Sequence, residues 1–345
     1  MADIARMAGV SESTVSRALA GSSRVAAATR TRIAELASAA RYTVNEGARS
    51  LRLGRTRTVE VLIPIEPDNP QSISDPFFLD LLGAIADALT ARGYDLLLSK
   101  SPPWGGSARG NSLVSGRADG LIIIGQGQRL KELRELTRAH RQIVVWGAHL
   151  ANEDYTIIGG DNREGGRLAC AHLLGLGRRR IAFLGDPSLP EIQERHQGYR
   201  EALLAAGLES DPDLVAPTKF DSEGAFVAAQ SLIARAPDVD GVVAASDVIA
   251  MSVISALAQA GRRTPADVGV VGYDDIFSAA WFNPALTTIS QSIHRGGEAL
   301  VEALFARMAG QPAASLLLPA QLIVRASCGA LALTKTKKGS RRSNP

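Results

Sequence analysis

Short polar side chains and one arginine follow a glycine near the start of the chain. Gly9 gives the backbone freedom to turn, and Ser11 is a residue type that caps the N-terminus of a helix. The next residues, ESTVSR over 12–17, place hydrogen-bonding groups along the first turns of that helix. A helix of this kind fits the major groove of DNA, where Arg17 can donate two hydrogen bonds to guanine. The spacing predicts a helix-turn-helix whose second helix reads base edges.

A second group of polar and aromatic residues follows the apolar runs further along the chain. Ligands of open α/β sheets bind at the carboxyl ends of the strands, where such residues would gather. A sugar needs carboxylates to accept hydroxyl protons, an arginine to donate, and a flat aromatic face for its C–H groups. The candidates at predicted strand ends, helix starts and the lobe crossover are Asp75, Phe77, Phe78, Arg195, Phe220, Ser246, Asp247, Asp274 and Gln291.

Two of these candidates have structural roles that compete with ligand binding. Asp247 stands directly before a helix expected to begin at Val248, so capping that helix is the favoured role of its carboxylate. Phe220 can belong to the hydrophobic core as readily as it can stack on a ligand. Arg195 and Asp274 are better candidates, because a charged side chain at a strand end is costly to bury without a partner.

Catalytic and metal-binding patterns are absent from the sequence. No GxxxxGK[ST], GxSxG or HExxH motif occurs, and Gly125-Gln126-Gly127 lacks the third glycine of a dinucleotide loop. The histidines are scattered, and the two cysteines, Cys170 and Cys328, have no CxxC spacing. We therefore expect a binding protein of the reducing cytoplasm, with no catalytic residue, no metal and no cofactor.

The elements that must position these residues change character along the chain. The first 45 residues predict three short helices, over 4–8, 11–19 and 29–40. From residue 58, apolar runs predict strands at 59–65, 95–100, 120–125, 142–146, 155–159, 180–185, 241–246 and 268–273. The intervening patterns predict helices over 78–92, 130–139, 164–176, 195–206, 222–234, 248–260 and 295–310. Buried strands separated by helices predict parallel sheets covered on both faces, and the length favours two doubly wound lobes.

Charge is divided unevenly along the chain, although the formal net charge is only +3. Residues 1–58 hold ten arginines against four acidic residues, and residues 334–345 hold five basic residues and no acidic one. Residues 59–333 hold 23 basic against 31 acidic residues, a net charge of −8. A basic N-terminal segment on an acidic body favours contact with a polyanion at that end. No apolar run reaches the roughly 20 residues that cross a bilayer, so we expect no membrane contact.

The segment DIARMAGVSESTVSRAL, together with ARSLRLGRTRTV, resembles the LacI/GalR family of transcription regulators, and the resemblance extends over nearly the whole chain. It implies that Glu12, Ser13 and Arg17 read bases and that Thr14, Ser16 and Arg24 contact phosphates. It also implies a hinge helix that contacts DNA through Asn45, Arg49 and Leu51. Leu51 would enter the central minor groove as an apolar wedge, which kinks the duplex in exchange for added contact.

The rest of the chain resembles the effector domain of the same family, which is similar to periplasmic binding proteins. The resemblance implies that Arg195, Phe220, Ser246, Asp274 and Gln291 line the effector pocket. The family often has an aspartate where VWGA stands at 145–148, so we expect Trp146 to stack on the ligand instead. The threonine that usually caps the first helix is also missing, so either Asp3 caps that helix or the natural chain begins further upstream.

These observations divide the chain into four parts. We expect a helix-turn-helix domain at 1–44, a hinge at 45–57, a two-lobed effector and dimerisation domain at 58–330, and a basic, disordered tail at 331–345. The N-lobe would comprise about 58–159 and 290–320, and the C-lobe about 160–289 and 321–330. The tail lacks leucine heptads, so we expect a homodimer rather than a tetramer assembled through the tail.

The expected function is sequence-specific binding of double-stranded DNA at a pseudo-palindromic operator. A small sugar effector would release this repressor from genes of carbohydrate uptake or catabolism. A corepressor-type regulator that responds to a purine is the alternative, because Phe77 and Phe78 would suit a nucleobase as well as a sugar. An enzyme is not expected, because the sequence contains no catalytic motif. A sugar-binding protein without DNA function would leave the first 58 residues unexplained.

Overall fold

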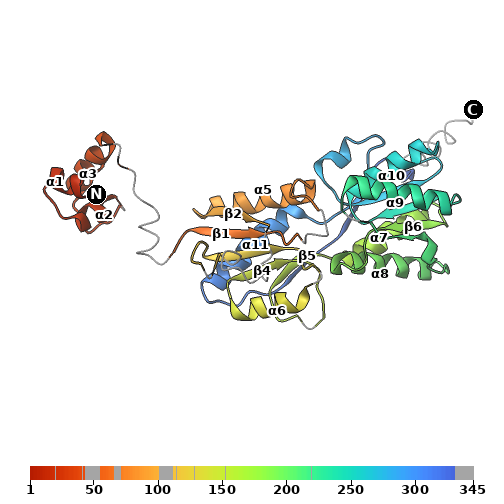
Figure 1. Ribbon diagram of the computed structural model, residues 1–345, viewed down its shortest axis with the longest axis horizontal. Coiled ribbons are helices and arrows are strands. Elements are labelled where there is room, and N and C mark those ends of the chain that lie inside the picture. The colour runs from red at the N-terminus through yellow and green to blue at the C-terminus, as the bar shows by residue number, and fades with distance from the viewer. Residues whose placement is uncertain are drawn as a thin grey trace, which may run out of the picture. The chain divides into compact units, whose positions relative to one another are not determined.

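The chain divides into two compact units, Met1–Thr56 and Arg57–Pro345, in a computed structural model (Figure 1). The structure describes residues 1–19, 21–40, 42, 55–65, 71–100, 112, 113, 115–127, 129–151, 153–218 and 220–330. The predicted hinge contacts Asn45, Arg49 and Leu51, and the predicted tail at 331–345, lie outside these residues. In the described part of the chain, no helix is long and apolar enough to span a membrane.

The first unit consists of three short helices, α1 (Ala2–Ala8), α2 (Glu12–Leu19) and α3 (Ala27–Ala39). Gly9 ends α1 with a φ of 66°, the left-handed conformation that favours glycine. The predicted cap of α2 is confirmed, because Ser11 Oγ accepts a hydrogen bond from the Thr14 N–H at 3.2 Å. A cap by Asp3, one of the two alternatives for the start of α1, is wrong. Asp3 lies inside the first turn and pairs with Arg6 at 2.8 Å, and Met1 makes no side-chain cap.

A small hydrophobic core holds these three helices together. Ile4, Val15 and Ile33 supply one deeply buried side chain from each helix. Arg30 of α3 fixes the loop before that helix, because its Nη1 donates to the carbonyl oxygens of Val25 at 2.7 Å and Ser22 at 3.3 Å. The core therefore lies on the inner side of α2 and leaves the other side of that helix open.

The second unit contains two six-stranded sheets. The first has the order β11-β5-β4-β3-β1-β2, and all its pairings are parallel. Its strands are β1 (Thr58–Leu62), β2 (Asp95–Ser99), β3 (Gly120–Ile124), β4 (Ile143–Trp146), β5 (Ile157–Gly160) and β11 (Leu316–Leu318). Helices α5 (Pro76–Thr90) and α11 (Ile293–Met308) pack together against one face, and α6 (Leu130–Ala139) covers the other (Figure 1).

The second sheet has the order β12-β10-β9-β8-β6-β7, and only β12 runs antiparallel to its neighbour. Its strands are β6 (Ile181–Leu184), β7 (Val215–Ala216), β8 (Gly241–Ala244), β9 (Gly269–Asp274), β10 (Thr287–Ser290) and β12 (Gln321–Ile323). Helices α7 (Asn162–Gly175) and α8 (Pro190–Ala205) lie on one side, and α9 (Ser222–Arg235) and α10 (Asp247–Gln259) on the other (Figure 1). Short 3-10 turns, η1 (Pro212–Leu214) and η2 (Phe277–Ala280), complete this lobe.

Three connections cross between the two sheets. The chain leaves the first sheet between β5 and α7, returns between β10 and α11, and leaves again between β11 and β12. The residues at these crossings are Asp161, Gln291 with Ser292, and Pro319 with Ala320. The first and third crossings are close together, since the Asp161 N–H donates to the Leu318 carbonyl at 2.9 Å.

The predicted fold class is confirmed: a small helical domain precedes two parallel-sheet α/β lobes. All eight predicted strands are present within a few residues of their expected bounds. Four further strands, β7, β10, β11 and β12, were not predicted, and each has only two to four residues. Helix α8 begins at Pro190 rather than at Arg195, which moves Arg195 one turn inside the helix.

Candidate functional site

The outer side of α2 presents the residues predicted to contact DNA. Glu12, Ser13 and Arg17 are exposed, whereas Thr14 and Ser16 are half-buried. Ser11 Oγ lies 2.9 Å from both Ser13 Oγ and Thr14 Oγ1, so three hydroxyls form one cluster at the start of the helix. Among the residues that the structure describes, the Arg17 guanidinium has no hydrogen-bond or ion-pair partner. It is therefore available to a ligand that approaches this side.

The loop between α2 and α3 carries the other predicted phosphate contact in this unit. Arg24 is exposed, and its backbone N–H donates to Ser22 Oγ at 3.4 Å. The neighbouring Val25 is buried in the core, and its carbonyl accepts from Arg30. Arg24 is thus held near α2 on an anchored loop.

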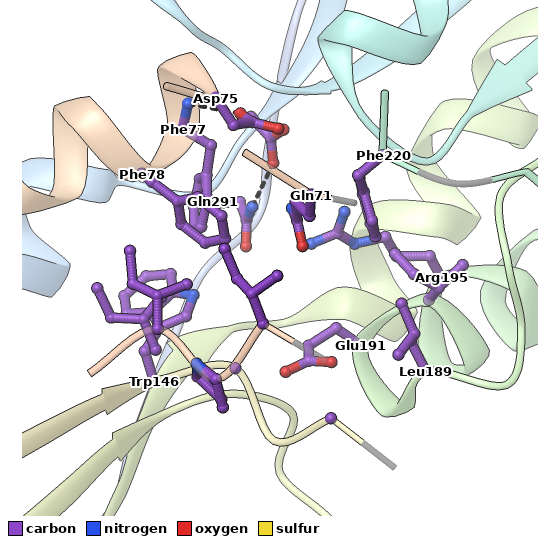
Figure 2. A pocket seen from close by; sticks show the side chains of 18 residues that line it. Gln71, Asp75, Phe77, Phe78, Trp146, Leu189, Glu191, Arg195, Phe220 and Gln291 are labelled. Atoms are coloured by element: carbon purple, nitrogen blue, oxygen red, sulfur yellow. Dashed lines mark hydrogen bonds between the residues drawn. The ribbon is translucent and has the colours of Figure 1, made fainter. Parts of the chain in front are cut away.

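A cavity lies in the second unit, at the ends of the central strands of both sheets (Figure 2). Most of the predicted effector residues line it, and Ser246 and Asp247 do not. The predicted residues on its wall are Asp75, Phe77, Phe78, Trp146, Arg195, Phe220, Asp274 and Gln291. They share the wall with Ile63, Pro64, Ile65, Gln71, Ile124, Gly125, Gly127, Leu189, Glu191 and Ile192.

Aromatic rings form one side of the cavity. The ring centroid of Phe77 lies 5.6 Å from that of Phe78 and 6.1 Å from that of Trp146. Trp146 ends β4, and Gly296 of α11 makes room for it, since a Cβ at Gly296 would lie 2.2 Å from the indole ring. Phe220 stands across the cavity and packs partly against the core of the second lobe (Figure 2). Flat apolar faces of this kind suit the C–H face of a sugar or the plane of a base.

Asp75 has two roles, as a helix cap and as a wall residue. Its Oδ1 accepts from the Phe77 N–H at 3.0 Å and so caps α5. Burial raises the pKa of this carboxyl, although the hydrogen bonds from Phe77 and Gln71 partly oppose the rise. The Asp75 carboxylate therefore both caps the N-terminus of α5 and offers a hydrogen-bond acceptor to the cavity.

Arg195 is held rigidly between helices and strands of the second lobe. Its Nε donates to Asn162 Oδ1 at 2.9 Å, its Nη1 donates to the Ala245 carbonyl at 2.5 Å, and its guanidinium lies 3.7 Å from the centre of the Tyr273 ring. Close packing of α7 on α8 sets its position, because a Cβ at Gly166 would lie only 1.9 Å from the Arg195 carbonyl oxygen. The side chain is almost entirely buried, with 6% of its surface exposed.

Asp274 and Gln291 join the end of β9 to the crossing segment after β10. Gln291 Nε2 donates to Asp274 Oδ1 at 2.6 Å. The backbone turns sharply here, with φ values of 113° at Asp274 and 61° at Asp275, and Asp275 pairs with Arg325 at 2.7 Å. Burial raises the pKa of Asp274 well above its usual range, and the charge of Arg195 opposes this rise. The hydrogen bond couples a strand end in one lobe to the segment that leads into the other.

Ser246 and Asp247 serve the fold instead of the cavity wall. Ser246 Oγ accepts from the Ile249 N–H at 3.2 Å and caps α10. Our prediction that Asp247 caps this helix is therefore wrong, because the helix begins one residue earlier than expected. Asp247 accepts instead from Thr288 Oγ1 at 2.6 Å and from the Ile276 N–H at 3.0 Å.

Glu191 and Gln71 are polar wall residues that our sequence reasoning missed. Glu191 lies in the first turn of α8, and its Oε1 accepts from the Gln126 N–H at 3.3 Å, which links the two lobes. The Gln126 side chain is fixed in turn, since its Nε2 donates to the Ala148 carbonyl and to Tyr155 Oη, each at 3.0 Å. The Pro190-Glu191 pair, which follows a predicted strand, is a helix-start signal that could have revealed this position.

Metal chemistry finds no support in the described ranges, where no group of three or more His, Cys, Asp or Glu side chains could hold an ion. The arrangement is one of donors, acceptors and aromatic faces around a cavity. It can bind a small polar molecule between two lobes.

Comparison with known protein families gives two matches on this chain. Residues 1–45 match the family described as bacterial regulatory proteins, lacI family, and residues 170–328 match a periplasmic binding protein-like domain. HTH-type transcriptional regulator CelR of Thermobifida fusca is 34% identical over 330 residues, which cover 94% of this chain and 96% of that protein. HTH-type transcriptional repressor PurR of Mannheimia succiniciproducens is 28% identical and covers 94% of this chain and 97% of its own length.

Solved structures agree with these sequence matches. A complex of transcriptional regulator CelR with cellobiose is 32% identical, covers 94% of this chain and 98% of that chain, and has a TM-score of 0.69. The lac repressor dimer bound to operator and the anti-inducer ONPF is 24% identical with the same coverages, and its TM-score of 0.80 demonstrates the shared fold.

Proposed function

The chain belongs to the LacI family of DNA-binding transcriptional regulators, and from that premise we propose that it is a repressor released from its operator by a small sugar. It would bind double-stranded, pseudo-palindromic DNA as a homodimer in the cytoplasm. Its targets would be genes of carbohydrate uptake or catabolism.

The cavity wall is the observation that carries the sugar assignment. Asp274 and Asp75 supply acceptors for hydroxyl protons, Arg195 supplies donors, and Phe77 and Trp146 supply flat apolar faces. The similarity to CelR, whose complex contains cellobiose, supports a disaccharide as the first ligand to try.

DNA recognition would follow from the open side of α2. Glu12, Ser13 and Arg17 would read bases, and Thr14, Ser16 and Arg24 would contact phosphates. The basic character of residues 1–58 supports this role, because phosphate contacts dominate the affinity of such proteins for DNA. Two copies related by a two-fold axis would read the two halves of a pseudo-palindrome.

Ligand and DNA would be coupled by a shift in population between two states. The cavity is lined by both lobes, and Gln291 stands on a segment that crosses between them, so a bound ligand changes the balance of lobe arrangements. The hinge around Asn45, Arg49 and Leu51 would be ordered in the DNA-bound state and would lose that order on effector binding. The ligand must favour the state of low DNA affinity by the free energy that it removes from DNA binding.

Corepression by a purine is the second candidate. It is favoured by the similarity to PurR and by the aromatic wall of Phe77, Phe78 and Trp146, which would also stack on a base. In that case the ligand would strengthen operator binding instead of weakening it. The two candidates therefore predict opposite signs of the same coupling.

A thermal-shift screen of the full chain against cellobiose, glucose, ribose, hypoxanthine and guanine tests the assignment. A ligand at about 100 times its Kd adds about 2.7 kcal/mol to the free energy of unfolding and raises Tm. We expect cellobiose to raise Tm, and we expect the rise to disappear in Asp274→Asn but persist in the exposed control Asp213→Asn. A rise with hypoxanthine or guanine and none with any sugar would replace the sugar by the purine.

A further inference from the structure

Arg57 is the first residue of the second unit, and both of its backbone polar groups are hydrogen-bonded. Asp119 Oδ2 accepts from the Arg57 N–H at 2.9 Å, and the Asp95 N–H donates to the Arg57 carbonyl oxygen at 2.8 Å. The Asp119 N–H also donates to the carbonyl oxygen of Thr58 at 2.8 Å. Asp95 begins β2 and Asp119 directly precedes β3, the two strands that flank β1. Arg57, Asp95 and Asp119 thus form a joint that fixes the point at which the chain enters the second unit.

The backbone of Arg57 has a left-handed conformation, with a φ of 54°. Residues other than glycine rarely adopt it, because their Cβ then lies too close to the following carbonyl oxygen. Such a conformation persists where the surrounding contacts hold it. Without the acceptor on Asp119, the Arg57 backbone could turn to a more common φ, and the preceding chain would then leave the sheet in another direction.

The two strands that start at this joint end at the cavity. β1 begins directly after Arg57 and is followed by the wall residue Ile63, and β3 begins directly after Asp119 and ends at the wall residue Ile124. The two strands are paired in parallel and are buried along almost their whole length. Because a close-packed interior deforms little, a displacement of this part of the wall would also move the joint.

We propose that Asp119 is a positioning residue for operator binding, which fixes the direction in which the chain passes from the second unit to the unit that carries α2. Holding Arg57 in advance reduces the ordering that operator binding must otherwise supply. Movement of β1 and β3 when a ligand binds shifts the joint, and this shift is how the cavity acts on DNA affinity. The last step rests on the proposed function, because it takes the cavity as the effector site.

Fluorescence anisotropy with an operator selected from a random-sequence DNA pool tests the role of Asp119 without any ligand. In Asp119→Ala the joint must be ordered during DNA binding, and ordering one backbone residue lowers affinity by a factor of about 5–30. We therefore expect this variant to bind operator at least about 5-fold more weakly than the native chain. Asp119→Asn should lose less than about 2-fold, because its amide oxygen still accepts from the Arg57 N–H.

Asp95→Ala is the matched control for the loss of a negative charge. Asp95 is an exposed residue at the same end of the sheet, and its bond to the Arg57 carbonyl comes from the backbone N–H, which alanine keeps. We expect its operator affinity to stay within about 2-fold of the native value. Affinity for a duplex without the operator sequence should also stay within about 2-fold in all three variants, because the basic residues of the first unit are unchanged.

A second comparison uses cellobiose as the ligand. Asp119 lies outside the cavity wall, so we expect calorimetry to give Asp119→Ala a cellobiose affinity within about 2-fold of native. The ratio of operator affinities without and with saturating cellobiose should fall at least about 3-fold in Asp119→Ala and stay native in Asp95→Ala. Native ligand binding with reduced coupling separates positioning from damage to the cavity.

The outcomes separate this inference from the proposed function. Native operator affinity in Asp119→Ala would overturn the role of Asp119, and so would an equal loss in Asp119→Asn or in Asp95→Ala. Equal losses on operator and non-operator DNA would overturn it as well, since positioning affects the specific complex. If cellobiose does not bind the native chain, the sugar effector is overturned, and the operator measurement without ligand still decides on Asp119.

Discussion

Helix α2 and the cavity each contain an arginine that we propose takes part in recognition. The two side chains differ in exposure and in the number of hydrogen bonds that they make within the protein. Arg17 stands exposed on α2 and has no partner among the described residues. Arg195 is buried, and two of its nitrogens, Nε and Nη1, donate to Asn162 and to the Ala245 carbonyl before any ligand arrives. The Arg17 side chain can therefore be replaced without disturbing the fold of α2, whereas replacement of Arg195 disturbs the second lobe.

The difference follows from the size of the partner. A DNA duplex presents phosphate and base-edge acceptors along the exposed side of a bound helix, so an exposed side chain such as Arg17 needs no internal partner. A small ligand supplies only a few groups, and the protein must hold its own side chains in place in advance. The comparison predicts that substitution of Arg17 affects DNA binding alone, and that substitution of Arg195 affects ligand binding and stability together.

The largest effect is expected for Arg195→Ala. The substitution leaves Asn162 Oδ1 and the Ala245 carbonyl without their donor, and unmade buried hydrogen bonds cost about 1–3 kcal/mol each. We expect the free energy of unfolding of the second unit to fall by about 3 kcal/mol in urea titrations, and effector affinity to fall by at least about 100-fold. An Arg195→Ala chain of native stability would break the comparison.

The substitution Arg17→Ala tests the α2 half of the comparison. We expect operator affinity to fall by about 1–3 kcal/mol and base preference to relax at one position in each half-site. The free energy of unfolding should change by less than about 0.5 kcal/mol, because the guanidinium has no internal partner to lose. Arg6→Ala in α1 is the matched control, and its loss of operator affinity should be clearly smaller. Equal losses in the two variants would remove Arg17 from base reading.

The pH dependence of the free energy of unfolding tests the effect of burying the Asp247 carboxyl in the second lobe. Burial raises the pKa of Asp247 from 3.8 to about 7. Since the folded pKa is the higher one, this carboxyl stabilises the fold fully below pH 4, and the contribution is lost as the pH rises to about 7. We expect stability to fall by up to about 1.4 kcal/mol per pH unit in that window relative to Asp247→Asn. Identical pH profiles of the two chains would contradict the assigned role of burial.

The two serine caps give the smallest expected effects. Ser11 caps the exposed α2, and Ser246 caps the buried α10. We expect Ser11→Ala to destabilise the first unit by about 0.5–1 kcal/mol and Ser246→Ala to destabilise the second by about 1–2 kcal/mol. Hydrogen exchange in each unit, monitored during thermal unfolding, measures the destabilisation caused by each substitution. Ser23→Ala in an exposed loop is the control. A larger cost for Ser11 would reverse the expected order.

The side of α2 that its polar residues share was easier to predict from the sequence than the set of residues that line the cavity, for a physical reason. The residues of α2 that we predict to contact DNA lie within one helix, so their spacing alone determines which side of it they share. The cavity residues come from positions as distant as Ile63 and Gln291, and sequence reasoning named eight of the eighteen.

The misses in the cavity arose where tertiary contacts decide the role of a residue. Glu191 escaped notice because α8 begins at Pro190, five residues before the expected start. Asp247 was misread because its partners, Thr288 and Ile276, lie far along the chain. Helix starts that differ by a few residues therefore change the assigned role of a polar side chain at a strand end.

Operator binding with and without ligand is the measurement that tests the central claim most directly. Operators can be selected from a random-sequence DNA pool, and their affinity measured by fluorescence anisotropy with cellobiose absent or saturating. We predict that cellobiose weakens operator binding by about 5–150-fold, the usual range of coupling between two sites, and that Arg195→Ala abolishes this response. Operator affinity that does not change at a cellobiose concentration shown to saturate the cavity would contradict the account.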